Sequence, residues 1–147
     1  MKRTLSGLAL ALAALSPFLA SAASADAALV KRGEYLARAA DCMACHTAEG
    51  GAPFAGGLPI QSPFGTIYGT NITPDKEHGI GAYSADEFFA ALTEGKRKDG
   101  AYLYPAMPYT SYHLIEREDA DAIYAYLMAQ EPIARPAPQT SLSFPFN

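Results

Sequence analysis

The chain contains two cysteines, which lie three positions apart, and a histidine directly follows the second one. Cys42, Cys45 and His46 therefore form the pattern Cys-x-x-Cys-His. This pattern is typical of c-type haem attachment, because two thiols at this spacing can add to the two vinyl groups on one porphyrin edge. The adjacent histidine then lies under the ring, where it can bind the iron. The motif predicts a fold built around one covalently bound haem c, with Cys42 and Cys45 as thioether sites and His46 as an axial ligand.

Three other uses of the cysteine pair explain the sequence less well. A structural zinc site usually takes four ligands from two separated pairs, and this chain has one pair. A thioredoxin-like dithiol follows a strand, whereas the Ala- and Leu-rich residues 27–40 before the motif have helical spacing. A plain disulfide stays open for an exported protein, but it leaves His46 without a role. Haem attachment is therefore the leading interpretation.

The residue on the opposite face of the iron separates two classes of function. A ligated iron makes an electron carrier, whereas an open position makes a gas sensor or a peroxidase-like enzyme. Met107 is the leading candidate for this ligand, because Pro105 and Pro108 stiffen the loop that carries it. His113 is the reserve ligand, and His78 lies in a Gly-rich turn where exposure to solvent is expected. Ligation by Met107 favours the electron carrier.

Three helices are predicted in the body of the chain, at residues 27–40, 84–94 and 118–129. Gly33 costs the first helix about 1 kcal/mol relative to alanine, so its expected use is to let another helix approach closely. Ser84 and Glu87 form a capping box that begins the second helix. Residues 47–82 hold most of the glycines and four prolines without periodicity, which predicts a long irregular segment around a cofactor. The sequence thus predicts an all-α fold, with three main helices and long loops around one covalently bound haem.

The two ends of the chain differ in composition from this body. Lys2 and Arg3 precede an apolar run and then small residues, so residues 1–25 are predicted to be a signal peptide. Several prolines in residues 132–147 leave little scope for helix or sheet, which predicts an extended tail or linker. The 147 residues have room for one domain, which we assign to residues 26–131. The formal charge of −4 argues against nucleic-acid binding, because phosphate contacts need basic residues.

Longer stretches around the motif make the sequence similar to a known family. The most specific are Thr-Asn-Ile-Thr-Pro-Asp at residues 70–75 and Leu-Tyr-Pro-Ala-Met-Pro-Tyr at residues 103–109, beside the attachment motif at residues 41–46. With these stretches the chain resembles class I cytochromes c. It is most similar to the first haem domain of the multi-haem cytochrome c subunit of membrane-bound alcohol and related dehydrogenases. That subunit carries three attachment motifs, whereas this chain carries one.

The resemblance implies a fold and a set of ligands. The fold is that of a small class I cytochrome c, in which the first and last helices cross at Gly33 against Tyr126. The two thioether sites correspond to the cysteines of the motif, as the spacing already predicts. The axial ligands of the haem iron correspond to His46 and Met107.

An electron-transfer protein, rather than an enzyme, is the function we predict. Export and a c-type haem indicate a periplasmic, single-haem cytochrome that carries one electron between a dehydrogenase and the respiratory chain. The expected redox partners are a periplasmic or membrane-bound dehydrogenase and a terminal oxidase or the quinone pool. The predicted domain has no run of about 20 apolar residues, so membrane contact is expected only by association. A haem sensor or peroxidase-like enzyme with an open sixth coordination site is the alternative.

Overall fold

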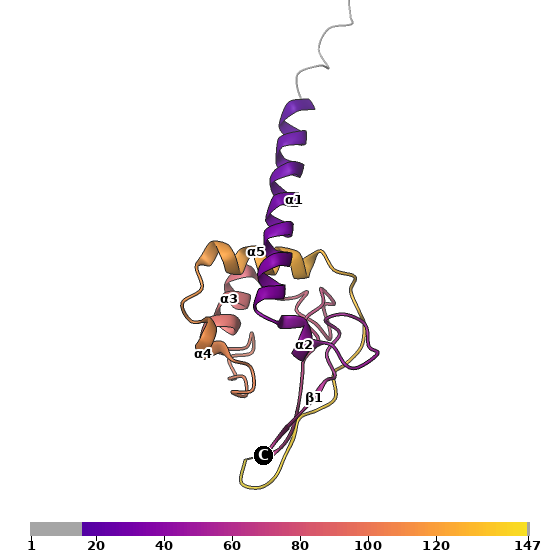
Figure 1. The fold of residues 1–147 in the computed structure, drawn as a ribbon, viewed down its shortest axis with the longest axis vertical. Helices are drawn as coiled ribbons and strands as arrows, with labels where there is room; N and C mark the ends of the chain where they lie inside the picture. The colour runs from indigo at the N-terminus through magenta and orange to yellow at the C-terminus, as the bar shows by residue number, and fades with distance from the viewer. Residues whose placement is uncertain (1–15, 147) are drawn as a thin grey trace, which may run out of the picture.

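The computed structural model describes residues 16–146, which form five helices and one small antiparallel sheet. The helices are α1 (Ser16–Ala39), α2 (Cys42–His46), α3 (Ala85–Glu94), α4 (Tyr109–Tyr112) and α5 (Arg117–Met128). The strands are β1 (Pro59–Ser62), β2 (Gly65–Tyr68) and β3 (Ser141–Leu142). In Figure 1, α1 extends from one end of the body and the β-hairpin extends from the other. The three predicted helices correspond to α1, α3 and α5, and each is confirmed.

The signal peptide is predicted at residues 1–25, and its residues 1–15 lie outside the part of the chain that the structure describes. Its last part belongs to α1, which begins at Ser16. Among the helices described between residues 16 and 146, none is long and apolar enough to cross a membrane.

α1 crosses α5 at Gly33, where the two helix backbones touch. A Cβ atom at Gly33 would lie 1.8 Å from the Ala122 carbonyl oxygen and 2.8 Å from the Tyr126 Cβ. Only hydrogen fits there, which explains why a poor helix former occupies the middle of α1. Arg32 pairs with Asp119 of α5 beside the crossing. The predicted close approach at Gly33, with Tyr126 as its partner, is confirmed.

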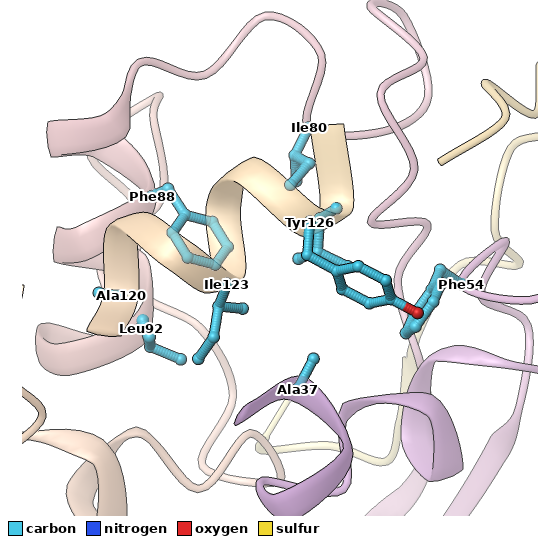
Figure 2. Packing of buried hydrophobic residues seen from close by; sticks show 9 residues of the cluster. Ala37, Phe54, Ile80, Phe88, Leu92, Ala120, Ile123 and Tyr126 are labelled. Carbon is cyan, nitrogen blue, oxygen red and sulfur yellow. The ribbon is translucent and has the colours of Figure 1, made fainter. Parts of the chain in front are cut away.

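The hydrophobic core lies where α1, α3 and α5 meet (Figure 2). Phe54, from a loop, packs edge-on against Tyr126 with 5.9 Å between ring centroids. The buried cluster contains nine residues: Ala37, Phe54, Ile80, Phe88, Leu92, Ala120, Ile123, Tyr126 and Leu127. Ten further apolar residues, Cys42 and Met107 among them, pack against the cluster but stay half-buried. Protein side chains alone therefore leave much apolar surface incompletely covered.

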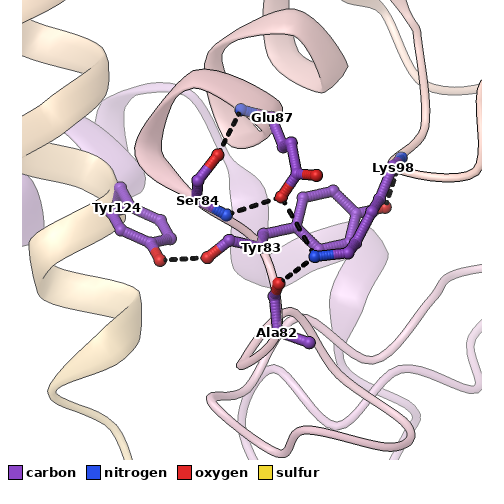
Figure 3. Close-up of polar contacts among 6 residues, drawn as sticks. All are labelled: Ala82, Tyr83, Ser84, Glu87, Lys98 and Tyr124. Atoms are coloured by element: carbon purple, nitrogen blue, oxygen red, sulfur yellow. Dashed lines mark hydrogen bonds and ion pairs between the residues drawn. The ribbon is translucent and has the colours of Figure 1, made fainter.

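α3 begins with the predicted capping box and is held from two sides. The Ser84 hydroxyl accepts a hydrogen bond from the Glu87 N–H at 3.2 Å, and Glu87 Oε2 accepts one from the Ser84 N–H at 2.7 Å. Lys98 Nζ donates to the same Glu87 oxygen at 3.2 Å (Figure 3). The Tyr124 hydroxyl of α5 donates to the Tyr83 carbonyl oxygen at 2.6 Å. These contacts fix α3 against α5 and against the loop that follows it.

The sheet is the main departure from the predicted loops and tail. Residues 47–82, predicted to be irregular, contain the β1–β2 hairpin, and the tail adds β3 beside β2. β3 passes close over Gly65, because a Cβ atom there would lie 2.3 Å from the Ser141 carbonyl oxygen. The Phe64 and Phe146 rings pack together with 4.4 Å between centroids. The expectation of a tail without sheet pairing was wrong, because strands of two to four residues are too short to show an alternating pattern.

Asn71 ties the returning tail to the body of the domain. Its side-chain NH₂ group donates to the carbonyl oxygens of Ile133 at 2.8 Å and Arg135 at 3.0 Å. Its Oδ1 accepts hydrogen bonds from the Thr73 N–H at 2.9 Å and from the Thr73 hydroxyl at 2.7 Å. Asn71 is buried, and these four bonds satisfy both ends of its amide. The segment from Asn71 to Thr73 therefore holds the tail from the side opposite β3.

Replacing Gly33 by alanine should destabilise the protein. The added methyl group would collide with the Ala122 carbonyl, and overpacking of this kind costs about 1–3 kcal/mol, against roughly 1 kcal/mol that alanine returns in helix propensity. Because backbone atoms must move, the cost lies in the upper part of this range, and we expect urea denaturation to show a net loss of about 1–2 kcal/mol. Lys31→Ala, at an exposed position of α1, is the control and should change stability by less than about 0.5 kcal/mol. Equal stability of the two variants would contradict the close crossing.

Replacing Asn71 by aspartate should detach the tail. The exchange puts an oxygen where the NH₂ group faces the Ile133 and Arg135 carbonyls, so we expect a loss of about 2–3 kcal/mol in the free energy of unfolding. Gln139→Glu adds the same charge at an exposed position of the tail and should leave stability nearly unchanged. Denaturation curves of both variants make the comparison. An Asp variant as stable as the Glu control would mean that the tail is held without this side chain.

Candidate functional site

The attachment motif forms a single helical turn, α2, at the end of α1. Asp41 separates the two helices and adopts the left-handed conformation, with φ 56° and ψ 31°. This conformation is uncommon for a residue with a Cβ atom, and here it turns the chain sharply between the helices. Cys42 and Cys45 are one turn apart, so their thiols lie on the same face of α2. The sequence spacing thus becomes a pair of thiols side by side.

Both cysteines are free thiols in the structure. Cys45 is exposed, and Cys42 is half-buried. Burial raises the pKa of Cys42 to about 11, with a smaller opposing effect from a backbone hydrogen bond. Cys42 is therefore protonated at neutral pH and is not poised as a reactive thiolate.

His46 is oriented by a backbone carbonyl. Its Nδ1 lies 2.7 Å from the Thr70 carbonyl oxygen. A carbonyl oxygen only accepts hydrogen bonds, so Nδ1 carries the proton and Nε2 keeps a free lone pair. Burial lowers the pKa of His46, and the bond to Thr70 opposes this effect in part. The imidazole is thus neutral, and Nε2 could bind a metal while Nδ1 keeps the outer hydrogen bond that metal-binding histidines usually have.

The chain around Gly69 passes directly against the motif. A Cβ atom at Gly69 would lie 1.8 Å from the Cys45 carbonyl oxygen, so only glycine allows this approach. Beside it, the Gly56 N–H donates to the His46 carbonyl at 2.8 Å. Thr47 accepts a hydrogen bond from the Phe54 N–H at 3.1 Å. The two segments that flank the β1–β2 hairpin, one before β1 and one after β2, therefore fix the position of α2.

Met107 lies half-buried against the same buried cluster as Cys42. Its N–H donates to the Tyr104 carbonyl at 3.1 Å, and its own carbonyl accepts from the Tyr109 N–H at 2.8 Å. These short turns, with a proline on each side, stiffen the loop as the sequence predicts. The structure thus brings the Met107 loop and the Cys42 end of the motif to one hydrophobic cluster.

The other two histidines have different surroundings. His113 is exposed, and its Nδ1 lies 2.6 Å from the Thr110 carbonyl oxygen of the same short helix. His78 is half-buried, and its backbone N–H donates to Asp75 Oδ1 at 2.7 Å. His113, the reserve ligand, is therefore held by its own turn rather than by a distant segment as His46 is.

Two contacts of the site were not predicted from the sequence. The Thr70 carbonyl oxygen orients His46. In the sequence, the one feature that hints at this contact is the neighbouring Gly69, which allows the chain to approach the motif. The Tyr112 hydroxyl donates to the Ala40 carbonyl oxygen at 2.8 Å, which joins α4 to the end of α1. Burial raises the pKa of the Tyr112 phenol, and the charges of Cys42, Cys45 and Asp41 raise it further. No sequence motif marks either contact, because the acceptor in each is a backbone carbonyl oxygen, which every residue has.

The residues of this region fit a covalently bound haem. Two free thiols share one face of a helical turn, and a neutral imidazole presents Nε2 next to them. Half-buried apolar side chains border the same region and could cover a large apolar ring. Among the described residues, no group of three or more His, Cys, Asp or Glu side chains could hold a metal ion by itself. Any iron here would therefore need the porphyrin as its main ligand.

Several proteins similar to this chain are cytochrome subunits of dehydrogenases. The gluconate 2-dehydrogenase cytochrome c subunit of Pantoea cypripedii is 53% identical over 141 residues, 95% of this chain and 32% of the relative. The alcohol dehydrogenase (quinone) cytochrome c subunit of Gluconobacter oxydans is 52% identical over 140 residues, 95% of this chain and 29% of the relative. The fructose dehydrogenase cytochrome subunit of Gluconobacter japonicus is 53% identical over 127 residues, 85% of this chain and 26% of the relative. The chain thus spans about a third or less of the length of these curated relatives.

A family model covers most of the described chain. The model for cytochrome c matches residues 30–131, a range that includes the attachment motif, the Met107 loop and the crossing of α1 with α5. Proteins of this family carry covalently bound haem c, and their fold is the one that the sequence predicts. The chain therefore belongs to the cytochrome c family.

Proposed function

We propose that the protein is a periplasmic, single-haem c-type cytochrome that carries one electron at a time between a dehydrogenase and the respiratory chain. In this proposal residues 1–25 direct export, residues 26–131 form the haem domain, and residues 132–147 are a tail or linker. The observation that carries the proposal is the hydrogen bond from His46 Nδ1 to the Thr70 carbonyl, at 2.7 Å. It leaves Nε2 free next to two free thiols, which is the donor set that a haem c needs.

Each site residue has one role in this proposal. The thiols of Cys42 and Cys45 attach the haem through thioether bonds, and His46 Nε2 binds the iron on one face. The Met107 thioether binds the iron on the other face, and this ligand favours the ferrous state and raises the reduction potential. The haem, when bound, supplies the one-electron couple. No catalytic residue is assigned, because electron transfer requires no substrate at the iron.

The carrier is favoured over a sensor or a peroxidase-like enzyme by the Met107 loop. The loop packs on the buried cluster and is braced by local hydrogen bonds at 3.1 and 2.8 Å, so its thioether is held in place. A site for gas binding or peroxide needs an open position instead. The relatives are described as cytochrome subunits of dehydrogenases, which supports a dehydrogenase as the redox partner. A terminal oxidase or the quinone pool completes the proposed path, with membrane contact only through association.

Removing both thiols should abolish covalent haem attachment. The protein expressed with the haem-attachment machinery should have the mass of the chain after removal of the signal peptide plus one haem, whereas Cys42→Ala/Cys45→Ala should lack the haem mass. Met43→Ala is the matched control, because Met43 is an exposed residue inside the same motif and is expected to be indifferent to attachment. Mass spectrometry under denaturing conditions makes the measurement. A wild-type protein without covalent haem would overturn the proposal.

Carbon monoxide should distinguish the two classes of function. The ferrous wild-type protein should bind carbon monoxide poorly at neutral pH, because the Met107 thioether occupies the iron. Met107→Leu should bind it readily, and Met128→Leu, on α5, should behave as the wild type. Optical titration of the three proteins gives the comparison. Ready binding by the wild type would favour the sensor or peroxidase-like alternative.

A further inference from the structure

A single side chain joins the end of α1 to α4, although the two are far apart in the sequence. α1 ends at Ala39, and the last carbonyl groups of a helix have no partner within the helix. The Tyr112 hydroxyl donates a hydrogen bond to the Ala40 carbonyl oxygen, directly after the end of α1, at 2.8 Å. Ala40 lies two residues before Cys42. The bond therefore reaches the point from which the attachment turn begins.

The backbone of Tyr112 is connected to Met107 through a short series of hydrogen-bonded turns. α4 begins at Tyr109, and its N-cap is Pro108, which directly follows Met107. The Tyr109 N–H donates to the Met107 carbonyl, and the Ser111 N–H donates to the Pro108 carbonyl, both at 2.8 Å. Met107 and Tyr112 thus belong to one continuous series of tight turns. A displacement of the Tyr112 ring would be passed on to Met107.

Apart from this bond, the segment meets the motif side of the site through apolar packing, because Met107, Tyr112 and Ile115 lie on the same cluster as Ala37 and Cys42. Among the described residues, the Tyr112 hydroxyl makes the one side-chain hydrogen bond from residues 104–116 to residues 16–46, the range that holds α1, α2 and the turn between them. On its opposite side the segment rests on α3, where Gly95 lies against the Tyr109 ring. Loss of the Tyr112 hydroxyl would therefore remove the directed contact between this segment and the start of the attachment turn, and only apolar packing would remain there.

We infer that Tyr112 is a positioning residue, whose hydrogen bond to Ala40 holds the Met107 loop over the iron position defined by His46. The inference rests on the proposed ligation by Met107. Tyr112 does not touch the iron in this scheme and acts through the loop. Its removal should raise the fraction of protein in which Met107 has left the iron.

The test compares two tyrosines that each donate a hydroxyl to a backbone carbonyl. Tyr112→Phe removes the bond to Ala40 and keeps the ring, and Tyr124→Phe removes the 2.6 Å bond from α5 to the Tyr83 carbonyl, before the start of α3. In the ferric holoprotein, added imidazole competes with Met107 for the iron. Its apparent affinity for Tyr112→Phe should be about tenfold higher than for the wild type, because a half-buried hydrogen bond no longer opposes loss of the thioether. Tyr124→Phe should bind imidazole as the wild type does.

The outcomes separate this inference from the function on which it rests. If the ferric wild type lacks the weak red absorption band that sulfur ligation produces, the proposed role of Met107 fails first. If the band is present and both variants bind imidazole with equal affinity, the positioning role of Tyr112 is wrong. Urea denaturation of both variants completes the comparison. A similar loss of stability in both, with tighter imidazole binding only in Tyr112→Phe, supports the inference.

Discussion

The backbone contact between α1 and α5 at Gly33 is the constraint on which the other contacts depend. With only hydrogen at this position, the two helices approach until the Ala122 carbonyl touches the Gly33 backbone. The buried cluster can then form between α1, α3 and α5, and the C-terminal end of α1 is fixed against it. Because the attachment turn begins three residues after α1 ends, this crossing also sets where Cys42 stands. A wider crossing would move the thiols relative to every loop that surrounds them.

The site itself is assembled from three segments that meet through backbone groups. The turn with the thiols comes from α2, the Thr70 carbonyl that orients His46 comes from a loop between β2 and α3, and Met107 comes from the loop before α4. Glycine at position 69 and a hydroxyl at position 112 allow the contacts that join these segments. Such an arrangement brings the proposed ligands from separate segments without requiring a large protein core. The half-buried apolar residues around the cluster are consistent with a cofactor that completes the core.

The tail shows how a segment with little regular structure can still be specified. β3 contributes two residues to the sheet, and Asn71 holds the opposite stretch of the tail through two carbonyl groups. Both contacts join residues more than 60 positions apart. The tail therefore packs on the domain by a few directed hydrogen bonds and one aromatic contact, between Phe64 and Phe146, rather than by a continuous apolar face.

The sequence by itself determined the features whose signals are local. Helical spacing and the capping box at Ser84 gave three helices, Gly33 indicated a close helix crossing, and the spacing of Cys42, Cys45 and His46 indicated the cofactor. Only the tertiary structure decided that the Thr70 carbonyl fixes the tautomer of His46, that Tyr112 reaches Ala40, and that the tail pairs with β2. In these three contacts at least one partner is a backbone group. Every residue carries the same carbonyl and amide groups, so the sequence cannot mark which of them will be used, and folding selects them through long-range packing.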